Sequence, residues 1–246
     1  MDYTERTYRD LHRQVDLIHF QVMIKETDLD IGVRRERFSP ELVQWVERLV
    51  KEQRLLLEEY IQRDPEFKTT LVPHRLLPGA PELAVEMAKA AQLAGVGPMA
   101  AVAGAFSQKV GRELARHSRD VIVENGGDIF LKSSGTRRVG IFAGPSPFTH
   151  KIALEVQGRQ TPLGICTSSG TVGHSLSFGQ SDAVIILASC TSLADAVATA
   201  AGNRVQSEED VQGAVDFAAS IPGIAGAIAI KGEKLAAWGQ IKLVPM

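Results

Sequence analysis

Charged residues are distributed very unevenly along this chain. Residues 1–78 carry 28 of the 56 Asp, Glu, Lys and Arg side chains, whereas residues 140–206 carry only six. The charge-poor stretch is rich in Gly, Ser, Thr and Ala, and a stretch of this length without charge cannot be exposed to solvent throughout. We therefore expect it to form core, an interface or the wall of a ligand pocket.

The overall composition predicts one globular domain spanning residues 1–246, with residues 1–18 as a peripheral N-terminal segment. The net charge of -2 argues against a nucleic-acid-binding surface. The charged N-terminus lacks the apolar region of a signal peptide, and no stretch approaches the roughly eighteen apolar residues that a membrane span needs. Two cysteines, Cys166 and Cys190, are too few for a disulfide framework. A cytoplasmic location is expected.

The spacing of apolar residues predicts helices that occur in pairs and strands that are mostly joined by short turns. The clearest helix start is Ser39-Pro40-Glu41, where a capping residue, a proline and an acid follow one another. Such an arrangement favours an α+β fold with an antiparallel sheet. Helices are expected at 39–63, 78–94, 99–117, 192–201 and 208–220, and strands at 19–31, 121–129, 138–143, 151–156, 165–168, 183–188, 226–231 and 235–244.

The first of two Gly-rich segments is Asn125-Gly126-Gly127-Asp128, which follows an apolar run. Paired glycines let a ligand approach the backbone closely, and the flanking residues supply an amide and a carboxylate. The same letters are equally typical of a hairpin turn or a β-bulge, because Asn-Gly is a strong turn signal. From the residues alone both interpretations stay open.

The second Gly-rich segment begins with three hydroxyl residues, Thr167, Ser168 and Ser169, and continues through Gly170 and Thr171 to His174. A loop of this kind can surround a phosphate or a ribose with N–H and O–H donors. Histidine titrates near neutral pH and can act as acid or base. A flexible polar loop is the alternative, but the low charge of the surrounding chain favours a pocket.

An alanine-rich helix carries Asp195 and Thr199 four residues apart and therefore on one face. A carboxylate and a hydroxyl on a face of small side chains can hold Mg²⁺, which prefers oxygen ligands. The alternative is that the acid simply complements the helix dipole in the first turn.

Two further features are weaker. Cys166 stands next to the polar loop and could be a nucleophile paired with His174, although a cysteine inside an apolar strand is more often a small buried side chain. The segment 95–100 matches a dinucleotide-binding pattern, but a helix precedes it where that pattern needs a strand, so this interpretation is rejected. A Gly-rich turn that opens a helix still presents N–H groups to an anion.

The order of these motifs resembles that of the ApbE family, the FAD:protein FMN transferases. A Gly-rich turn opens an Ala-rich helix, a strand carries Gly-Gly-Asp, a Ser-Gly loop contains a histidine, and Ala-Asp-Ala-x-Ala-Thr follows. The segments 25–29 and 142–147 and the tail around Trp238 are most similar to the uncharacterised ApbE-like branch. The resemblance covers about residues 19–244 and implies a T-fold-like fold of duplicated antiparallel sheets with packed helices.

The resemblance also implies a function. ApbE-like proteins bind FAD with Mg²⁺, cleave its pyrophosphate and pass FMN to a Thr or Ser of an acceptor flavoprotein, and a homodimer is possible. His174 and Asp128 are the catalytic candidates on this basis. The implied Mg²⁺ ligands are Asp195, Thr199 and the carbonyl of Ala100, and the implied flavin or nucleotide contacts are Asn125, Gly126, Gly127, Thr167, Ser168, Ser169, Gly170 and Thr171.

The sequence departs from the transferase pattern at two places. After His174 it reads Ser-Leu-Ser-Phe-Gly in place of Asp-Pro-x-Thr-Gly, and Ala101 stands where transferases usually have lysine. Three hypotheses follow: an Mg²⁺-dependent FMN transferase or FAD pyrophosphate-cleaving enzyme, a flavin- or nucleotide-binding protein without transferase activity, and a thiol-dependent enzyme that uses Cys166.

Overall fold

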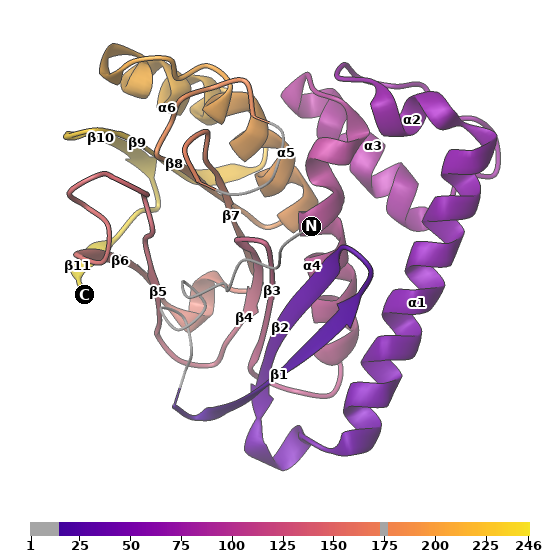
Figure 1. Cartoon of the computed structure of the whole chain (residues 1–246). Coiled ribbons are helices and arrows are strands. Elements are labelled where there is room, and N and C mark those ends of the chain that lie inside the picture. Colours follow the sequence, from indigo (N-terminus) through magenta and orange to yellow (C-terminus); the bar gives the residue numbers. More distant parts are fainter. Residues whose placement is uncertain (1–14, 173–176) are drawn as a thin grey trace.

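Eight strands form one continuous antiparallel sheet in the order β1-β2-β3-β4-β7-β8-β9-β10. The computed structural model describes residues 15–172 and 177–246 (Figure 1). The strands are β1 Leu17–Ile24, β2 Thr27–Arg34, β3 Val121–Asn125, β4 Asp128–Lys132, β7 Leu163–Ser168, β8 Ala183–Ala188, β9 Ile224–Lys231 and β10 Lys234–Gly239.

A second sheet has three strands in the order β11-β6-β5, with β11 at Leu243–Pro245, β6 at Ile152–Val156 and β5 at Arg137–Gly140. In Figure 1 this small sheet and the long helix α1 lie on opposite sides of the molecule. The helices are α1 Pro40–Arg63, α2 Pro65–Thr69, α3 Glu82–Ala94, α4 Val102–Leu114, α5 Thr191–Gly202 and α6 Val211–Ala219, and the short 3₁₀ turns are η2 Arg35–Arg37, η3 Pro98–Ala101, η4 Gly158–Gln160 and η5 Glu208–Asp210.

The large sheet is built from two units of the same plan. In the first unit β1 and β2 are followed by α3 and α4 and then by β3 and β4. In the second, β7 and β8 are followed by α5 and α6 and then by β9 and β10. The first unit also contains α1 and α2, and β5 and β6 lie between the units. Because β4 pairs with β7, the two units share one sheet. This arrangement confirms the α+β fold of duplicated antiparallel strands.

Each face of the large sheet buries its own core, because successive side chains of a strand point to opposite faces. On β3 and β4, Val121, Val123 and Phe130 join the core beneath the helices. Ile122 and Leu131 join the core between the two sheets. The site described below lies on the helix-covered face.

Two expected strands are hairpins in the structure, so those predictions were wrong. The expected strand 19–31 folds back at Lys25 and Glu26, and Lys25 adopts a φ of 53°. The expected strand 121–129 folds back at Gly126 and Gly127. In both cases a two-residue turn interrupts the chain so briefly that the apolar pattern runs on through it.

Other boundaries agree only in part. The expected helix 78–94 begins at Glu82, and the expected helix 99–117 divides into η3 and α4. The expected strand 235–244 ends at Gly239, which has a φ of 83°, and continues as β11 in the other sheet.

The helix α1 begins after Ser39, whose Oγ accepts a hydrogen bond from Leu42 N at 3.3 Å. The final hairpin turns at Gly232, which has a φ of 56°. The short helix α2 was not expected: Pro65 ends α1 and also occupies the first position of α2.

No single helix in the part of the chain that the structure describes is long and apolar enough to cross a membrane. One bent pair, Glu82–Ala94 with Pro98–Leu114 at 103°, meets the criteria of length and composition together.

Candidate functional site

The Asn125–Asp128 segment is a tight hairpin turn that joins β3 to β4. Asn125 pairs with Asp128, and the two glycines between them have φ values of 66° and 101°. Positive φ at both central positions suits glycine, which explains the pair in the sequence. The turn interpretation is therefore confirmed. It does not exclude a ligand, since a Cβ at Gly126 would meet no atom of residues 15–172 and 177–246 within 4 Å.

This turn is held against the first turns of α4. Asn125 Nδ2 donates to the carbonyl of Ala103 at 3.2 Å. Ser107 Oγ donates to the carbonyl of Asp128 at 2.8 Å. The N-terminus of a helix carries a partial positive charge. Asp128, the first residue of β4, therefore lies beside the positive end of α4.

Asp195 reaches the same place from α5. Its Oδ2 accepts a hydrogen bond from Gly104 N at 2.8 Å, so the carboxylate caps the N-terminus of α4. Burial raises the pKa of Asp195 to about 7, although hydrogen bonds from the Gly104 and Ala103 amides act in the opposite direction. The two amides alone therefore do not compensate the buried charge.

Asp128 is the second buried carboxylate. Burial raises its pKa well above the ordinary value, and the nearby charge of Asp195 raises it further. Its Oδ1 is buried and has no hydrogen-bond partner within the described ranges 15–172 and 177–246. The nearby Cys166 thiol and Thr167 amide lower this pKa but do not outweigh burial. A buried oxygen without a partner is costly and points to a missing cation or proton.

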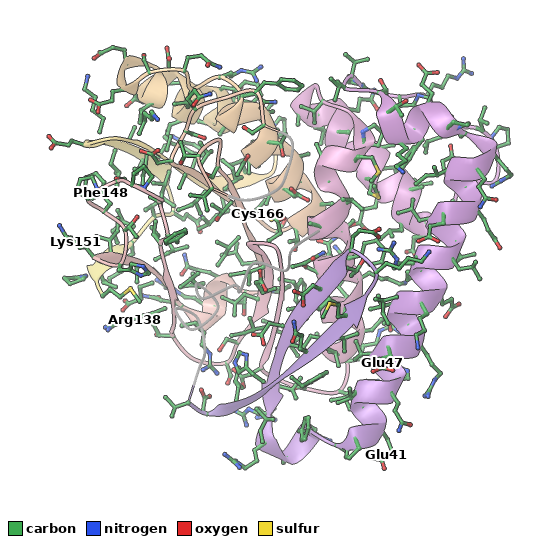
Figure 2. All side chains as sticks on the ribbon, in the orientation of Figure 1. Glu41, Glu47, Arg138, Phe148, Lys151 and Cys166 are labelled. Atoms are coloured by element: carbon green, nitrogen blue, oxygen red, sulfur yellow. The ribbon has the colours of Figure 1, made fainter. Side chains whose placement is uncertain are left out.

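Cys166 lies on β7 between the sheet and α5. Figure 2 shows it inside the molecule, whereas Glu41 lies at the outer edge, near the start of α1. Its thiol donates to the carbonyl of Thr191 at 3.3 Å. Burial raises the pKa of the thiol well above its ordinary value, and the charges of Asp128 and Asp195 add to this effect. Only the thiolate is a good nucleophile, so the structure favours the buried, protonated alternative.

The second Gly-rich segment divides into two parts. Thr167 lies next to the turn: a Cβ on Gly127 would be 3.9 Å from Thr167 Cβ. Further on, Ser169 Oγ accepts hydrogen bonds from Thr171 N at 3.2 Å and Val172 N at 2.9 Å, and Thr171 Oγ1 donates to Asp182 Oδ1 at 3.1 Å. The later hydroxyl groups therefore hold the loop itself in shape.

The close packing around this loop depends on glycine. Gly170 N donates to Ser181 O at 2.9 Å, and a Cβ on Gly170 would lie 2.0 Å from the carbonyl oxygen of Gly179. At the end of α5, a Cβ on Gly202 would lie 3.1 Å from Ser168 Oγ. The loop is thus fixed against the C-terminus of α5. His174 lies outside the described residues, and its catalytic role stays a prediction.

The other two expected Mg²⁺ ligands lie on elements that pack together. Ala100 is half-buried in η3, and Thr199 is half-buried on α5 one turn beyond Asp195. The amide of Gly104, which a continuous helix would direct to the Ala100 carbonyl, donates to Asp195. Residues 15–172 and 177–246 contain no group of three or more His, Cys, Asp and Glu side chains placed to hold a metal.

Several residues of the site were not anticipated from the sequence. Gln108 on α4 accepts a hydrogen bond from Thr191 N at 2.7 Å through Oε1, and its Nε2 donates to Glu86 on α3. Ser107 supports the Asp128 backbone. A Ser-Gln pair inside an otherwise apolar helix face was the available signal, because buried polar side chains need partners.

The Gly-rich turn at 95–100 has a structural role. Gly95 has a φ of 73° and ends α3 in the left-handed conformation. A Cβ on Gly97 would lie 1.9 Å from the carbonyl oxygen of Thr70. The helix that precedes this turn confirms that the dinucleotide-binding interpretation was rightly rejected.

The fold defines a class of protein. The flavin transferase ApbE from Vibrio cholerae has the same fold, with a TM-score of 0.58 and 13% sequence identity over 90% of this chain and 96% of that chain. The ApbE-type fold expected from the motifs is thereby confirmed.

The particular family is shown by sequence. A family model described as "AbpE bacteria" matches residues 9–231. A UPF0280 protein from Methanocella arvoryzae is 42% identical over 89% of this chain and 87% of its own length. Another from Methanosarcina acetivorans is 39% identical over 91% of this chain and 86% of its length. The chain belongs to this ApbE-like family.

Proposed function

We propose that this protein binds a flavin dinucleotide together with Mg²⁺ at the Asp128–Asp195 site and acts on the pyrophosphate of the nucleotide. The observation that carries the proposal is the pair of buried carboxylates, one of which has an oxygen without a partner in the described chain. A divalent cation beside them would neutralise both charges.

The residues around the pair fit Mg²⁺. The ion prefers oxygen ligands, keeps several waters and commonly uses one or two carboxylates together with substrate phosphates. Asp195, the Thr199 hydroxyl and the Ala100 carbonyl would hold it, with Asp128 facing it from the sheet. Two carboxylates are enough for such a site, which agrees with the absence of a larger His, Cys, Asp and Glu group among the described residues.

The nucleotide would lie along the turn and the loop that follow β3 and β7. The open positions at Gly126 and Gly127 allow close approach to the backbone, since a Cβ at Gly127 would be no nearer than 3.9 Å to Thr167. Mg²⁺, when bound, would neutralise developing charge on the phosphates, and Asp128 and His174 are proposed to hold and move protons.

A mixture of pure protein, FAD and MgCl₂, with and without a Thr-containing acceptor peptide, tests the proposal. We expect release of AMP with FMN, or transfer of FMN to the peptide, and loss of either activity in Asp195→Asn. The matched control is Asp64→Asn: Asp64 is also a buried aspartate, but it is bonded to His74 and Tyr60. The control should keep full activity. Absence of AMP and FMN release from wild type under both conditions would refute the enzymatic proposal.

The second candidate function is flavin or nucleotide binding without transfer. It is supported by Ala101, which is fully buried in η3 and supplies no cation where transferases usually have lysine. Fluorescence titration with FAD distinguishes the two. Tight binding that persists in Asp195→Asn, without any product release, selects the binding protein.

A further inference from the structure

The helices α4 and α5 cap each other. Gln108 on α4 is 1% exposed, and its Oε1 accepts a hydrogen bond from Thr191 N, the first residue of α5, at 2.7 Å. In return Asp195 on α5 accepts from Gly104 N, near the start of α4, at 2.8 Å. Each helix thus satisfies an amide that the other leaves without an intrahelical partner.

The Gln108 amide has one defined orientation. Its Nε2 donates to Glu86 on α3, and Ser192 Oγ donates to the same carboxylate. A carboxylate only accepts and a backbone N–H only donates, so Nε2 must face Glu86 while Oε1 faces Thr191. Three helices therefore meet at one buried amide group.

The start of α5 has no room to shift. A Cβ on Gly104 would lie 2.6 Å from Thr191 O and 2.8 Å from Asp195 Cβ, and a Cβ on Gly164 would lie 2.5 Å from Thr191 Cα. Thr191 is clamped between α4 and β7. Because Asp195 follows Thr191 by about one helical turn, any displacement of Thr191 moves the Asp195 carboxylate.

We propose that Gln108 is a positioning residue for Asp195, acting through Thr191 and held in place by Glu86. The inference rests on the proposed function, since Asp195 is the Mg²⁺ ligand proposed there. Gln108 does not contact the metal or the nucleotide. Its role is to fix the start of α5 so that the Asp195 carboxylate stays at the N-terminus of α4.

Two measurements on Gln108→Leu test this role: Mg²⁺ affinity by calorimetry and hydrogen exchange of the Gly104 amide, which reports the bond to Asp195 without metal. We expect about a tenfold loss of Mg²⁺ affinity, the low end of what partners behind a metal ligand contribute, and faster exchange at Gly104. Gln108→Glu keeps the size of the side chain and the acceptor for Thr191 N, but its charge repels that of Glu86. It should also lower Mg²⁺ affinity and speed Gly104 exchange, and it replaces Gln108→Leu if that variant does not fold.

The charge-swapped double variant Glu86→Gln with Gln108→Glu provides the rescue. It restores one amide and one carboxylate and keeps an acceptor for Thr191 N, so affinity and exchange should return toward wild type. The matched control is Tyr60→Phe on α1. It removes a buried hydroxyl that donates a hydrogen bond to Asp64 at 2.8 Å. This control should lower stability without changing Gly104 exchange or Mg²⁺ affinity.

Wild-type values in both Gln108 variants would overturn the inference, as would equal losses in Tyr60→Phe, because these would indicate general destabilisation. If wild type itself binds no Mg²⁺, the proposed function fails. The Gly104 exchange rate then still decides whether Gln108 positions Asp195.

Discussion

Two ends of the β3–β4 hairpin carry buried aspartates in opposite electrostatic situations. Asp120, just before β3, is 1% exposed, and Asp128, at the start of β4, is 6% exposed. Asp120 accepts hydrogen bonds from Arg34 Nε at 2.6 Å, Ser133 Oγ at 2.7 Å and Ser134 N at 2.8 Å. Burial is similar at the two ends, so the difference lies in the partners.

The direction of the pKa shifts follows from those partners. Burial by itself raises the pKa of Asp120, but the hydrogen bonds from Ser134, Ser133 and Arg34 outweigh it and lower the pKa. At Asp128 burial and the charge of Asp195 both raise the pKa. A buried carboxylate with its own cations serves the structure, whereas a buried pair without one is a candidate for binding or catalysis.

The largest expected effect comes from the same substitution made at both ends. Asp120→Asn should cost about 3–5 kcal/mol of unfolding free energy, because it leaves the buried Arg137 and the partly exposed Arg34 without their shared carboxylate. Asp128→Asn should be neutral or stabilising by about 1–2 kcal/mol, since an amide avoids the buried charge that burial and the neighbouring Asp195 disfavour. Urea denaturation measures both, and a larger loss in Asp128→Asn would contradict the comparison.

An intermediate effect is expected in the pH dependence of stability without metal. The pKa of Asp195 is raised to about 7 in the folded protein. Its contribution is therefore fully present below the unfolded pKa near 4 and is lost as pH rises through about 7, amounting to at most about 4 kcal/mol.

Asp120 has the opposite sign: its lowered pKa contributes stability above the unfolded pKa, and this is lost as pH falls toward the folded pKa. Urea midpoints between pH 4 and 8 should thus decline less steeply in Asp195→Asn than in wild type. Parallel profiles for the two proteins would show that Asp195 is not the group that titrates.

The smallest effect is expected at the thiol between the two carboxylates. Cys166→Ser keeps a donor for the Thr191 carbonyl and should cost about 1 kcal/mol. Because burial raises the pKa of the thiol, FAD binding and turnover should not change. Cys190→Ser is the matched control. A loss of turnover in Cys166→Ser alone would support the thiol-dependent alternative.

Local signals predicted part of the fold well. The cap at Ser39 and the proline at position 40 define the start of α1 because a helix terminus is a local event. The hairpin at 25–26 was not recognised as a strand break, and the turn at 126–127 was only one of two open interpretations. Both turns are only two residues long, and the pairing of β1 with β2 and of β3 with β4 decides whether such a segment continues or reverses.

The candidate site was also predicted only in part, because local motifs are visible in the sequence and long-range contacts are not. The sequence indicated Asn125 to Asp128 and Asp195 as separate segments, and their family-like order placed them in one pocket. The roles of Gly104 and Gln108 were not predicted, since a glycine or glutamine on a helix gives no sign of the distant helix that it contacts.

The sequence by itself determined the α+β class, the long helix α1 and the charge-poor stretch 140–206, which cannot be exposed to solvent throughout. Only the tertiary structure decided which buried aspartate has a counter-ion. That outcome depends on groups from β2, β4, β5, α4 and α5 that are distant along the chain and meet only when the sheet forms. Burial and neighbouring charge set the pKa of Asp120 and the pKa values of Asp128 and Asp195, and both are properties of the folded molecule.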